Sequence, residues 1–144
     1  MDLPEHLKLQ GILTQGGAFK AQLSINPKKE RYYFVLNVDP KTDTVLVLVT
    51  STTDFFPHKS CAGADDVHIN LSVQDYTELS ANCLICCDRP RKMPKATLER
   101  ELKTQKYTLL KPLPKPVLDR ILVGIEKSPV VTSDIKELVL GGNS

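Results

Sequence analysis

No apolar run in this chain approaches the roughly 20 residues that a membrane-spanning helix needs. A secretory signal is also lacking, because Asp2 and Glu5 interrupt the basic and apolar segments that such a signal requires. These two absences predict a cytoplasmic protein with no membrane partner. The chain has 144 residues, of which 41% are hydrophobic and 25% charged, and it contains no repeat or low-complexity tract. Such a composition predicts one globular domain over residues 1–144.

The chain has little net charge, since 19 Lys and Arg residues stand against 17 Asp and Glu residues and leave a formal charge of +2. This balance does not imply a nucleic-acid partner, because polyanion binding depends on where the cations lie rather than on their total. Basic residues gather in two short runs, at 28–31 and at 89–92. Two basic loops on one face would suit phosphates, and runs this short are equally typical of a solvated surface.

Cysteines are few, and they are Cys61, Cys83, Cys86 and Cys87. Without a secretory signal a disulfide framework is disfavoured, which leaves a zinc site as the rival hypothesis. Residues 83–87 have the apolar character of a buried strand, and a strand directs positions i and i+3 to opposite faces. Cys83 and Cys86 therefore do not suit one metal ion. We expect core cysteines and no metal site.

Two apolar runs of strand length, Arg31–Asn37 and Val45–Ser51, are the most informative feature of the chain. They are rich in β-branched and aromatic residues and are separated by an Asp-Pro turn at 39–43, which predicts adjacent strands of one sheet. The first begins with an arginine, and the second ends with the hydroxyl pair Thr50 and Ser51. The rims of a sheet are where exposed polar groups meet ligands, so the pair marks a candidate site.

The remaining segments predict a mainly β domain with C-terminal helices. We expect further strands at 18–23, 67–71, 83–87 and 106–110, a long loop at 52–66, a helical turn at 72–75, a basic loop at 89–92, and helices at 94–105, 116–125 and 134–140. Residues 3–13 fit neither a helix nor a strand cleanly. A small α+β or β-barrel domain follows, because the connections are too short for the crossovers of a parallel sheet.

This order of elements resembles the MazF and PemK toxins of bacterial toxin–antitoxin systems, which have a small SH3-like barrel. The resemblance lies in Arg31–Asn37, in Val45–Ser51 and in Asn82–Arg91, followed by the helix at 116–125. It places the barrel core at about residues 29–126, with the short helix at 134–140 beyond it. The chain departs from the family in lacking its opening Gly-Asp signature, in having Arg89 for the usual glutamine, and in lacking an acidic residue just beyond Arg91.

The resemblance implies a metal-independent endoribonuclease that needs no cofactor and cleaves single-stranded RNA through a 2′,3′-cyclic phosphate. It also implies a homodimer that is silenced by an antitoxin. Arg31 would be the cation and proton donor, Thr50 would hydrogen-bond the phosphate, and Ser51 would complete the candidate catalytic set. An arginine suits this role because its planar fork can contact two phosphate oxygens together.

A second set of residues would bind the RNA chain in the same interpretation. Its members are basic, aromatic or acidic residues of the two predicted loops and of the first strand: Lys29, Tyr32, Asp88, Arg89, Arg91 and Lys92. Bases would stack on Tyr32, Tyr33 or Phe56. At least one of the aromatic residues at 32–34 must face the core, since side chains alternate across a sheet.

Other interpretations stay open beside this one. An arginine at a strand start is commonly a surface residue, and a Thr-Ser pair at a strand end is commonly part of a turn. His58 and His68 have no carboxylate at a recognisable spacing, so we expect structural or surface roles for both. The barrel could instead be a catalytically inactive module that binds RNA or protein, or an accessory protein of a phage or plasmid with no nucleic-acid role.

Overall fold

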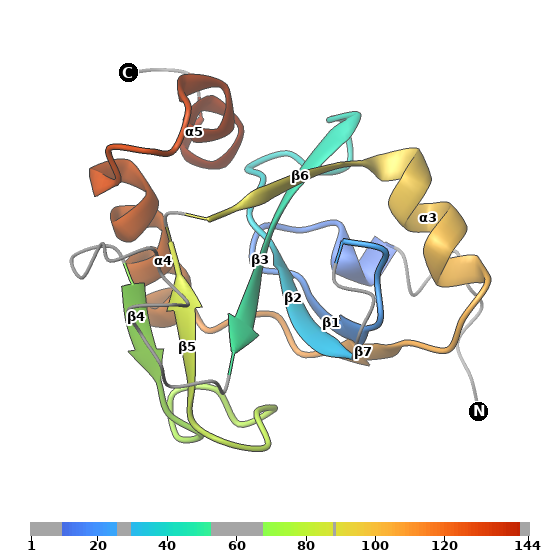
Figure 1. Ribbon diagram of the computed structural model, residues 1–144, viewed down its shortest axis with the longest axis horizontal. Helices are drawn as coiled ribbons and strands as arrows, with labels where there is room; N and C mark the ends of the chain where they lie inside the picture. Colours follow the sequence, from blue (N-terminus) through green and yellow to red (C-terminus); the bar gives the residue numbers. More distant parts are fainter. Residues whose placement is uncertain (1–9, 26–29, 53–67, 88, 142–144) are drawn as a thin grey trace.

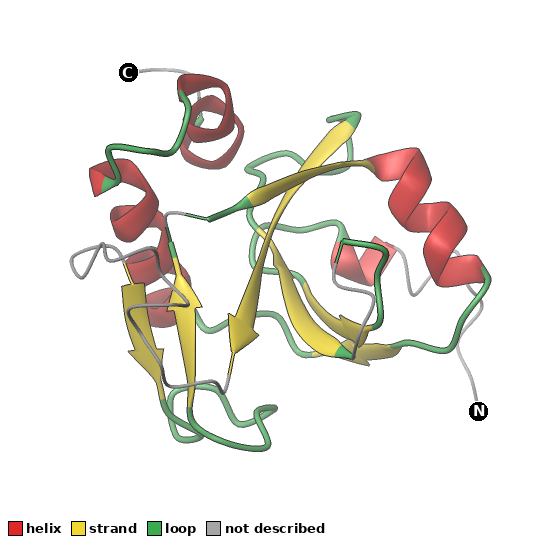
Figure 2. Ribbon diagram, viewed as in Figure 1, coloured by secondary structure: helices red, strands yellow, loops and turns green. Residues whose placement is uncertain are grey.

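The computed structural model describes residues 10–25, 30–52, 68–87 and 89–141 of the chain (Figure 1). All seven strands of the described residues belong to one antiparallel sheet, coloured yellow in Figure 2. The strands are β1 (Ala18–Ala21), β2 (Arg31–Val35), β3 (Val45–Thr52), β4 (His68–Leu71), β5 (Cys83–Cys86), β6 (Arg91–Pro94) and β7 (Thr108–Leu110).

The seven strands form a sheet in the order β4-β5-β3-β2-β1-β7, and β6 pairs with β3 outside this path. Strand β3 is the longest and the centre of the sheet. One of its edges pairs with β2, and its other edge pairs first with β6, from Val45 to Leu48, and then with β5, from Ser51 to Thr52. In the described residues the sheet is not closed, since no pairing joins β4 to β7. The predicted mainly β fold with C-terminal helices is confirmed.

Two hydrophobic cores lie on opposite faces of the sheet. Along β2 the side chains alternate, so that Tyr33 and Val35 enter one core while Phe34 enters the other. Strand β3 alternates in the same way. Both runs are apolar at every central position because both faces are covered, which explains why they stand out in the sequence.

Helices α3, α4 and α5 cover these cores, and Figure 1 shows α3 on the opposite side of the sheet from α4 and α5. Helix α3 (Lys95–Lys103) contributes Leu98 and Leu102 to the core that contains Tyr33. We call this side of the sheet the α3 face. Helices α4 (Lys115–Lys127) and α5 (Ser133–Leu140) pack on the other core, and we call that side the α4 face.

The helix ends follow local sequence signals. Pro116 lies in the first turn of α4, where its missing N–H costs no hydrogen bond. Helix α5 ends at Gly141, whose φ of 79° is in the left-handed region that favours glycine. No helix of the described segments has the length and apolar character required to cross a membrane.

One expected element is wrong. The sequence predicts a loop for the basic run at 89–92, but its second half begins strand β6, in which Arg91 pairs with Leu48 and Lys92 with Val47. The physical reason is that the edge of β3 from Val45 to Leu48, far away in the chain, provides hydrogen-bond partners for the backbone of β6. Pairing of this kind stabilises an extended conformation that the charged local sequence does not favour.

Candidate functional site

The β2–β3 hairpin positions the first two candidate residues. Tyr33 lies opposite Thr50, Phe34 opposite Val49 and Val35 opposite Leu48. The hairpin is closed by Asn37, which is fully buried although polar. Its Nδ2 donates to the carbonyl of Val45 at 2.9 Å and to Asp43 Oδ2 at 2.8 Å, and its Oδ1 accepts from the Val47 N–H at 2.7 Å. The sequence predicts Asn37 only as the last residue of a strand, and these three hydrogen bonds are visible only in the structure.

Arg31, Thr50 and Arg91 lie on the same face of the sheet. Paired residues point to the same side and alternate residues along a strand share a side. Arg31 is two residues before Tyr33, which pairs with Thr50, and Arg91 pairs with Leu48, two residues before Thr50. Tyr33 and Leu48 both belong to the core beneath α3. The structure therefore brings these three predicted site residues to the α3 face, on three neighbouring strands.

The Arg31 guanidinium is half-buried, and its Nε is enclosed without a hydrogen-bond partner. Among the described residues, no carboxylate forms an ion pair with Arg31 or Arg91. A buried donor that no protein atom accepts costs about 1–3 kcal/mol, and a catalytic role or a bound water or ion is among the usual reasons for one. The Arg31 charge is therefore not neutralised by any carboxylate of the described residues.

The hydroxyl of Thr50 is oriented by the neighbouring strand. Thr50 Oγ1 donates to the carbonyl oxygen of Tyr32 at 2.7 Å, and the Ser51 carbonyl lies farther away at 3.4 Å. The side chain is half-exposed. In this orientation the hydroxyl proton is used within the protein, and the oxygen lone pairs are free to accept a hydrogen bond from a ligand.

Ser51 is separated from these residues by the sheet. It follows Thr50 in β3 and pairs with Ile85 of β5, so it points to the α4 face, and only 6% of it is exposed. Its hydroxyl forms a hydrogen bond with the Cys83 thiol. Burial raises the pKa of that thiol, and the Ser51 hydrogen bond offsets part of the rise.

Tyr32 also points to the α4 face, where it has structural partners. Its hydroxyl donates to the Glu78 carbonyl at 3.2 Å and accepts from the Ser80 N–H at 3.1 Å. The Lys20 ammonium lies 5.1 Å from the centre of its ring. Tyr33 is fully buried and its ring stacks on Phe19 at 5.5 Å, so it has no surface for a base. Phe56, the third predicted stacking residue, lies outside the described residues.

The predicted RNA-binding cations are divided between the two faces. Arg89 is exposed in the turn before β6, where its N–H donates to the Cys86 carbonyl at 3.2 Å. Lys92 points to the α4 face and forms an ion pair with Asp134 of α5 at 2.6 Å. Lys92 and the hydroxyl of Thr132 lower the pKa of Asp134 to about 2. Lys29 and Asp88 lie outside the described residues.

The cysteines match the expected core positions in part. Cys83 and Cys87 are buried free thiols, as expected. Cys86 is half-buried and disulfide-bonded, which corrects the expectation that it is a core thiol. Within the described ranges no group of three or more His, Cys, Asp or Glu side chains is arranged to hold a metal ion. His58 and Cys61 lie outside those ranges, and His68 is the first residue of β4.

The chain is similar to solved structures of the MazE–MazF complex from Deinococcus radiodurans. One of them, crystal form III, has 11% sequence identity and a TM-score of 0.51, and the match covers 79% of this chain and 92% of that chain. Form II gives 12% identity and a TM-score of 0.49, covering 79% and 91%. No protein-family model and no curated protein matches the sequence. The chain therefore has the MazF-like fold, a seven-stranded antiparallel sheet with C-terminal helices.

Proposed function

We propose that this protein is a toxin-like endoribonuclease that cleaves single-stranded RNA without a metal ion and leaves a 2′,3′-cyclic phosphate. The observation that carries the proposal is the half-buried Arg31, whose Nε has no protein partner and whose side chain shares the α3 face with Thr50. The MazF-like fold supports the same function. Arg31, Thr50 and Arg91 form the proposed site.

In the proposed reaction the ribose 2′-hydroxyl attacks the adjacent phosphorus, and the bond to the 5′-oxygen of the next nucleotide breaks. Negative charge grows on the non-bridging oxygens, and a preorganised cation with two parallel donors stabilises it. In this proposal Arg31 takes this role. The proton of the 2′-hydroxyl passes to solvent water, the departing 5′-oxygen receives a proton from an Arg31 N–H, and the guanidinium regains its proton from solvent.

Thr50 acts on the nucleophile in this proposal. Because its proton is donated to the Tyr32 carbonyl, Oγ1 offers lone pairs, which suit the hydrogen of the 2′-hydroxyl. Donation to a phosphate oxygen would require release of the Tyr32 carbonyl. Arg91, which is exposed at the start of β6, would hold a neighbouring phosphate of the RNA.

The comparison also supports an antitoxin partner and a homodimer, since the similar structures are complexes of MazF with MazE. In this proposal the antitoxin silences the protein, and the RNA site forms on each copy of a dimer in the cytoplasm.

A second function is favoured by one observation. Among the described residues, no carboxylate or imidazole forms a hydrogen bond or ion pair with Arg31, Thr50 or Arg91, so none is held in place as a general base. A module that binds RNA or protein without cleaving it needs no base. The basic α3 face would then bind phosphates and release them unchanged.

Cleavage of a mixed-sequence single-stranded RNA in the presence of EDTA separates the two functions. The proposal expects cleavage by the wild-type protein, a loss of about a hundredfold or more in Arg31→Ala, and a smaller loss in Thr50→Val. Arg100→Ala is the matched control, because Arg100 is an exposed arginine on α3 with no partner among the described residues. Equal cleavage by Arg31→Ala, with circular dichroism showing both proteins folded, would overturn the assignment.

A further inference from the structure

The segment that follows β1 is held by the side chain of Glu101, in the last turn of α3, and by that of Gln105, two residues beyond the end of this helix. The Gln22 N–H donates to Gln105 Oε1 at 3.0 Å, and Gln105 Nε2 donates to the Gln22 carbonyl at 2.7 Å. The Ser24 N–H donates to Glu101 Oε1 at 2.8 Å, and the Ser24 hydroxyl donates to Glu101 Oε2 at 2.6 Å. We call these four hydrogen bonds the α3 clamp.

Beyond the end of β1, the α3 clamp provides hydrogen-bond partners for the backbone of Gln22 and Ser24. The ladder between β1 and β7 ends where Lys20 pairs with Thr108, and two residues later both backbone groups of Gln22 form hydrogen bonds with the Gln105 side chain. Glu101 lies in the last turn of α3, and Gln105 follows two residues after the helix ends at Lys103. The two pairs run in reversed order, since Glu101 contacts Ser24 and Gln105 contacts Gln22, as in an antiparallel arrangement.

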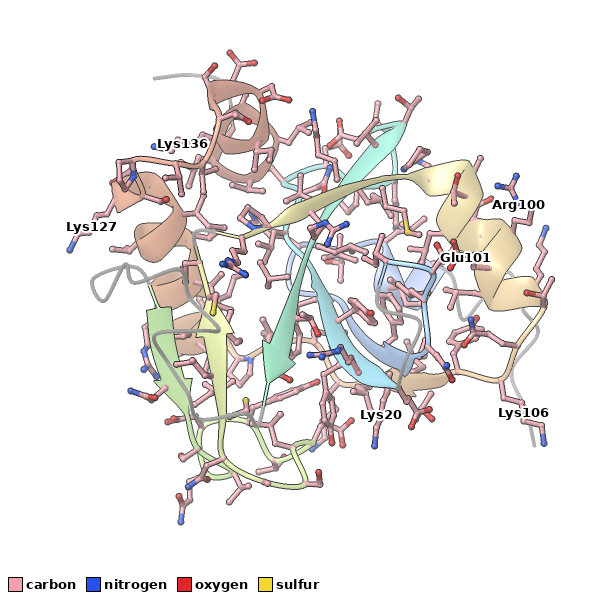
Figure 3. All side chains as sticks on the ribbon, viewed as in Figure 1. Lys20, Arg100, Glu101, Lys106, Lys127 and Lys136 are labelled. Atoms are coloured by element: carbon pink, nitrogen blue, oxygen red, sulfur yellow. The ribbon has the colours of Figure 1, made fainter. Side chains whose placement is uncertain are left out.

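The α3 clamp lies beside the backbone that carries the proposed catalytic arginine. Ala21, the last residue of β1, is the cross-strand partner of Arg31, and Gln22 is the next residue along the chain. Between the two clamped residues, Leu23 is fully buried in the core of the α3 face. Glu101 is labelled on α3 in Figure 3, together with Arg100, which points away from the rest of the molecule. The same turn of α3 thus fixes the chain on one side and presents Arg100 to solvent.

We propose that Glu101 and Gln105 are positioning residues for Arg31. By fixing Gln22 and Ser24, they fix the end of β1, and the pairing of Ala21 with Arg31 transmits this restraint to the start of β2. The direction of the Arg31 guanidinium then depends on α3, although α3 contributes no group to the reaction. The expected effect on kcat rests on the proposed ribonuclease activity. The expected effect on the order of β1 and β2 rests on the structure alone.

The chemistry of the two clamp residues gives a discriminating set of variants. Glu101→Gln keeps one acceptor for the Ser24 N–H, and its amide N–H₂ can donate to the Ser24 hydroxyl, so the clamp persists. Glu101→Ala removes both hydrogen bonds. Gln105→Glu loses the donor to the Gln22 carbonyl and places a carboxylate against that oxygen. Glu99→Ala is the matched control, because Glu99 lies on the same helix and has no partner among the described residues.

The kinetic test measures kcat and KM for cleavage of single-stranded RNA. We expect Glu101→Ala and Gln105→Glu to lower kcat by about tenfold while KM changes less than about twofold, since a misdirected Arg31 affects the transition state more than binding. Glu101→Gln and Glu99→Ala should keep the wild-type kcat. A wild-type kcat in Glu101→Ala, or a kcat in Glu101→Gln as low as in Glu101→Ala, would overturn the inference.

A second measurement does not depend on cleavage. Hydrogen exchange followed by mass spectrometry should show faster exchange in peptides covering β1 and the start of β2 in Glu101→Ala, with β4 and β5 unchanged. If the wild-type protein cleaves no RNA while this change is observed, the proposed function fails and the positioning of Arg31 by α3 stands. If exchange in β1 and β2 is unchanged, the positioning fails whatever the activity.

Discussion

Replacing Asn37 with alanine tests how the hairpin that carries the proposed site is held together. Asn37 is fully buried and makes three hydrogen bonds, two of them to backbone groups of β3. Alanine removes all three at once. The Val47 N–H is then left in a buried position without its side-chain acceptor, and the Val45 carbonyl loses a donor.

The expected cost follows from these groups. An orphaned buried N–H costs about 1–3 kcal/mol, and the loss of a hydrogen bond to a partly exposed carbonyl costs about 1 kcal/mol. Asn37→Ala should therefore lower the free energy of unfolding by about 2–4 kcal/mol. For a domain of this size, each 1 kcal/mol lowers Tm by roughly 3–4 °C, so Tm should fall by roughly 6–16 °C.

Urea unfolding followed by circular dichroism measures this change directly. Asp43→Asn is the control, because an amide oxygen at position 43 can still accept from Asn37 Nδ2, and its cost should stay below about 1 kcal/mol. A loss below about 1 kcal/mol for Asn37→Ala, with the m-value unchanged, would refute the hydrogen-bond account of the hairpin.

Three further predictions follow from particular contacts. In Gly17→Ala the added Cβ would lie 2.0 Å from a backbone carbonyl oxygen, so the free energy of unfolding measured in urea should fall by about 2–3 kcal/mol. Gly11→Ala is the control, because its Cβ would meet only a leucine side chain at 3.3 Å, and it should cost less than half as much. Asp134 has its pKa lowered to about 2, first by the hydrogen bond from Lys92, so the stability it contributes is complete above its ordinary value of 3.8 and is lost as pH falls toward 2. Thermal unfolding at pH 5 and pH 2.5 should show a smaller difference in Asp134→Asn than in the wild type, and an equal difference would contradict the ion-pair account. Burial raises the pKa of the Cys83 thiol, so iodoacetamide at pH 8 should leave this thiol unmodified in the folded protein and alkylate it in urea. Mass spectrometry measures the modification, and equal rates in the folded and unfolded protein would show that the thiol is accessible.

The central hairpin and the C-terminal helices could be predicted because their signals are local. Strands β2 and β3 are apolar at every central position since both faces are buried, and the Asp-Pro turn between them is short. Pro116 marks the start of α4, and the left-handed Gly141 marks the end of α5. In each case neighbouring residues carry enough information to specify the element.

Strand β6 could not be predicted in this way. Met93 is its single core residue, and it lies between Lys92 and Pro94, so the local sequence is typical of a loop. Its extended conformation depends on the free edge of β3, more than 40 residues earlier in the chain, and no short window of sequence contains that partner.

The candidate site was predictable in its residue types and only partly in its geometry. Arg31 and Thr50 share a face because Tyr33 pairs with Thr50, a register that the sequence leaves open. The separation of Ser51 from Thr50 follows from strand alternation alone and could have been anticipated. Predicting that Arg91 and Lys92 point to opposite faces requires knowing that both lie in strand β6. It also requires knowing that Asp134 of α5 forms an ion pair with Lys92.

The most direct test of the central claim compares a single-stranded RNA with the same oligonucleotide carrying a 2′-deoxyribose at the cleaved position, both incubated with the wild-type protein in EDTA. The account predicts that the all-ribose substrate yields a 2′,3′-cyclic phosphate end, identified by mass spectrometry, and that the 2′-deoxy substrate stays intact at that position. Cleavage of the 2′-deoxy position, or no cleavage of the all-ribose RNA by folded protein free of any antitoxin, would contradict it.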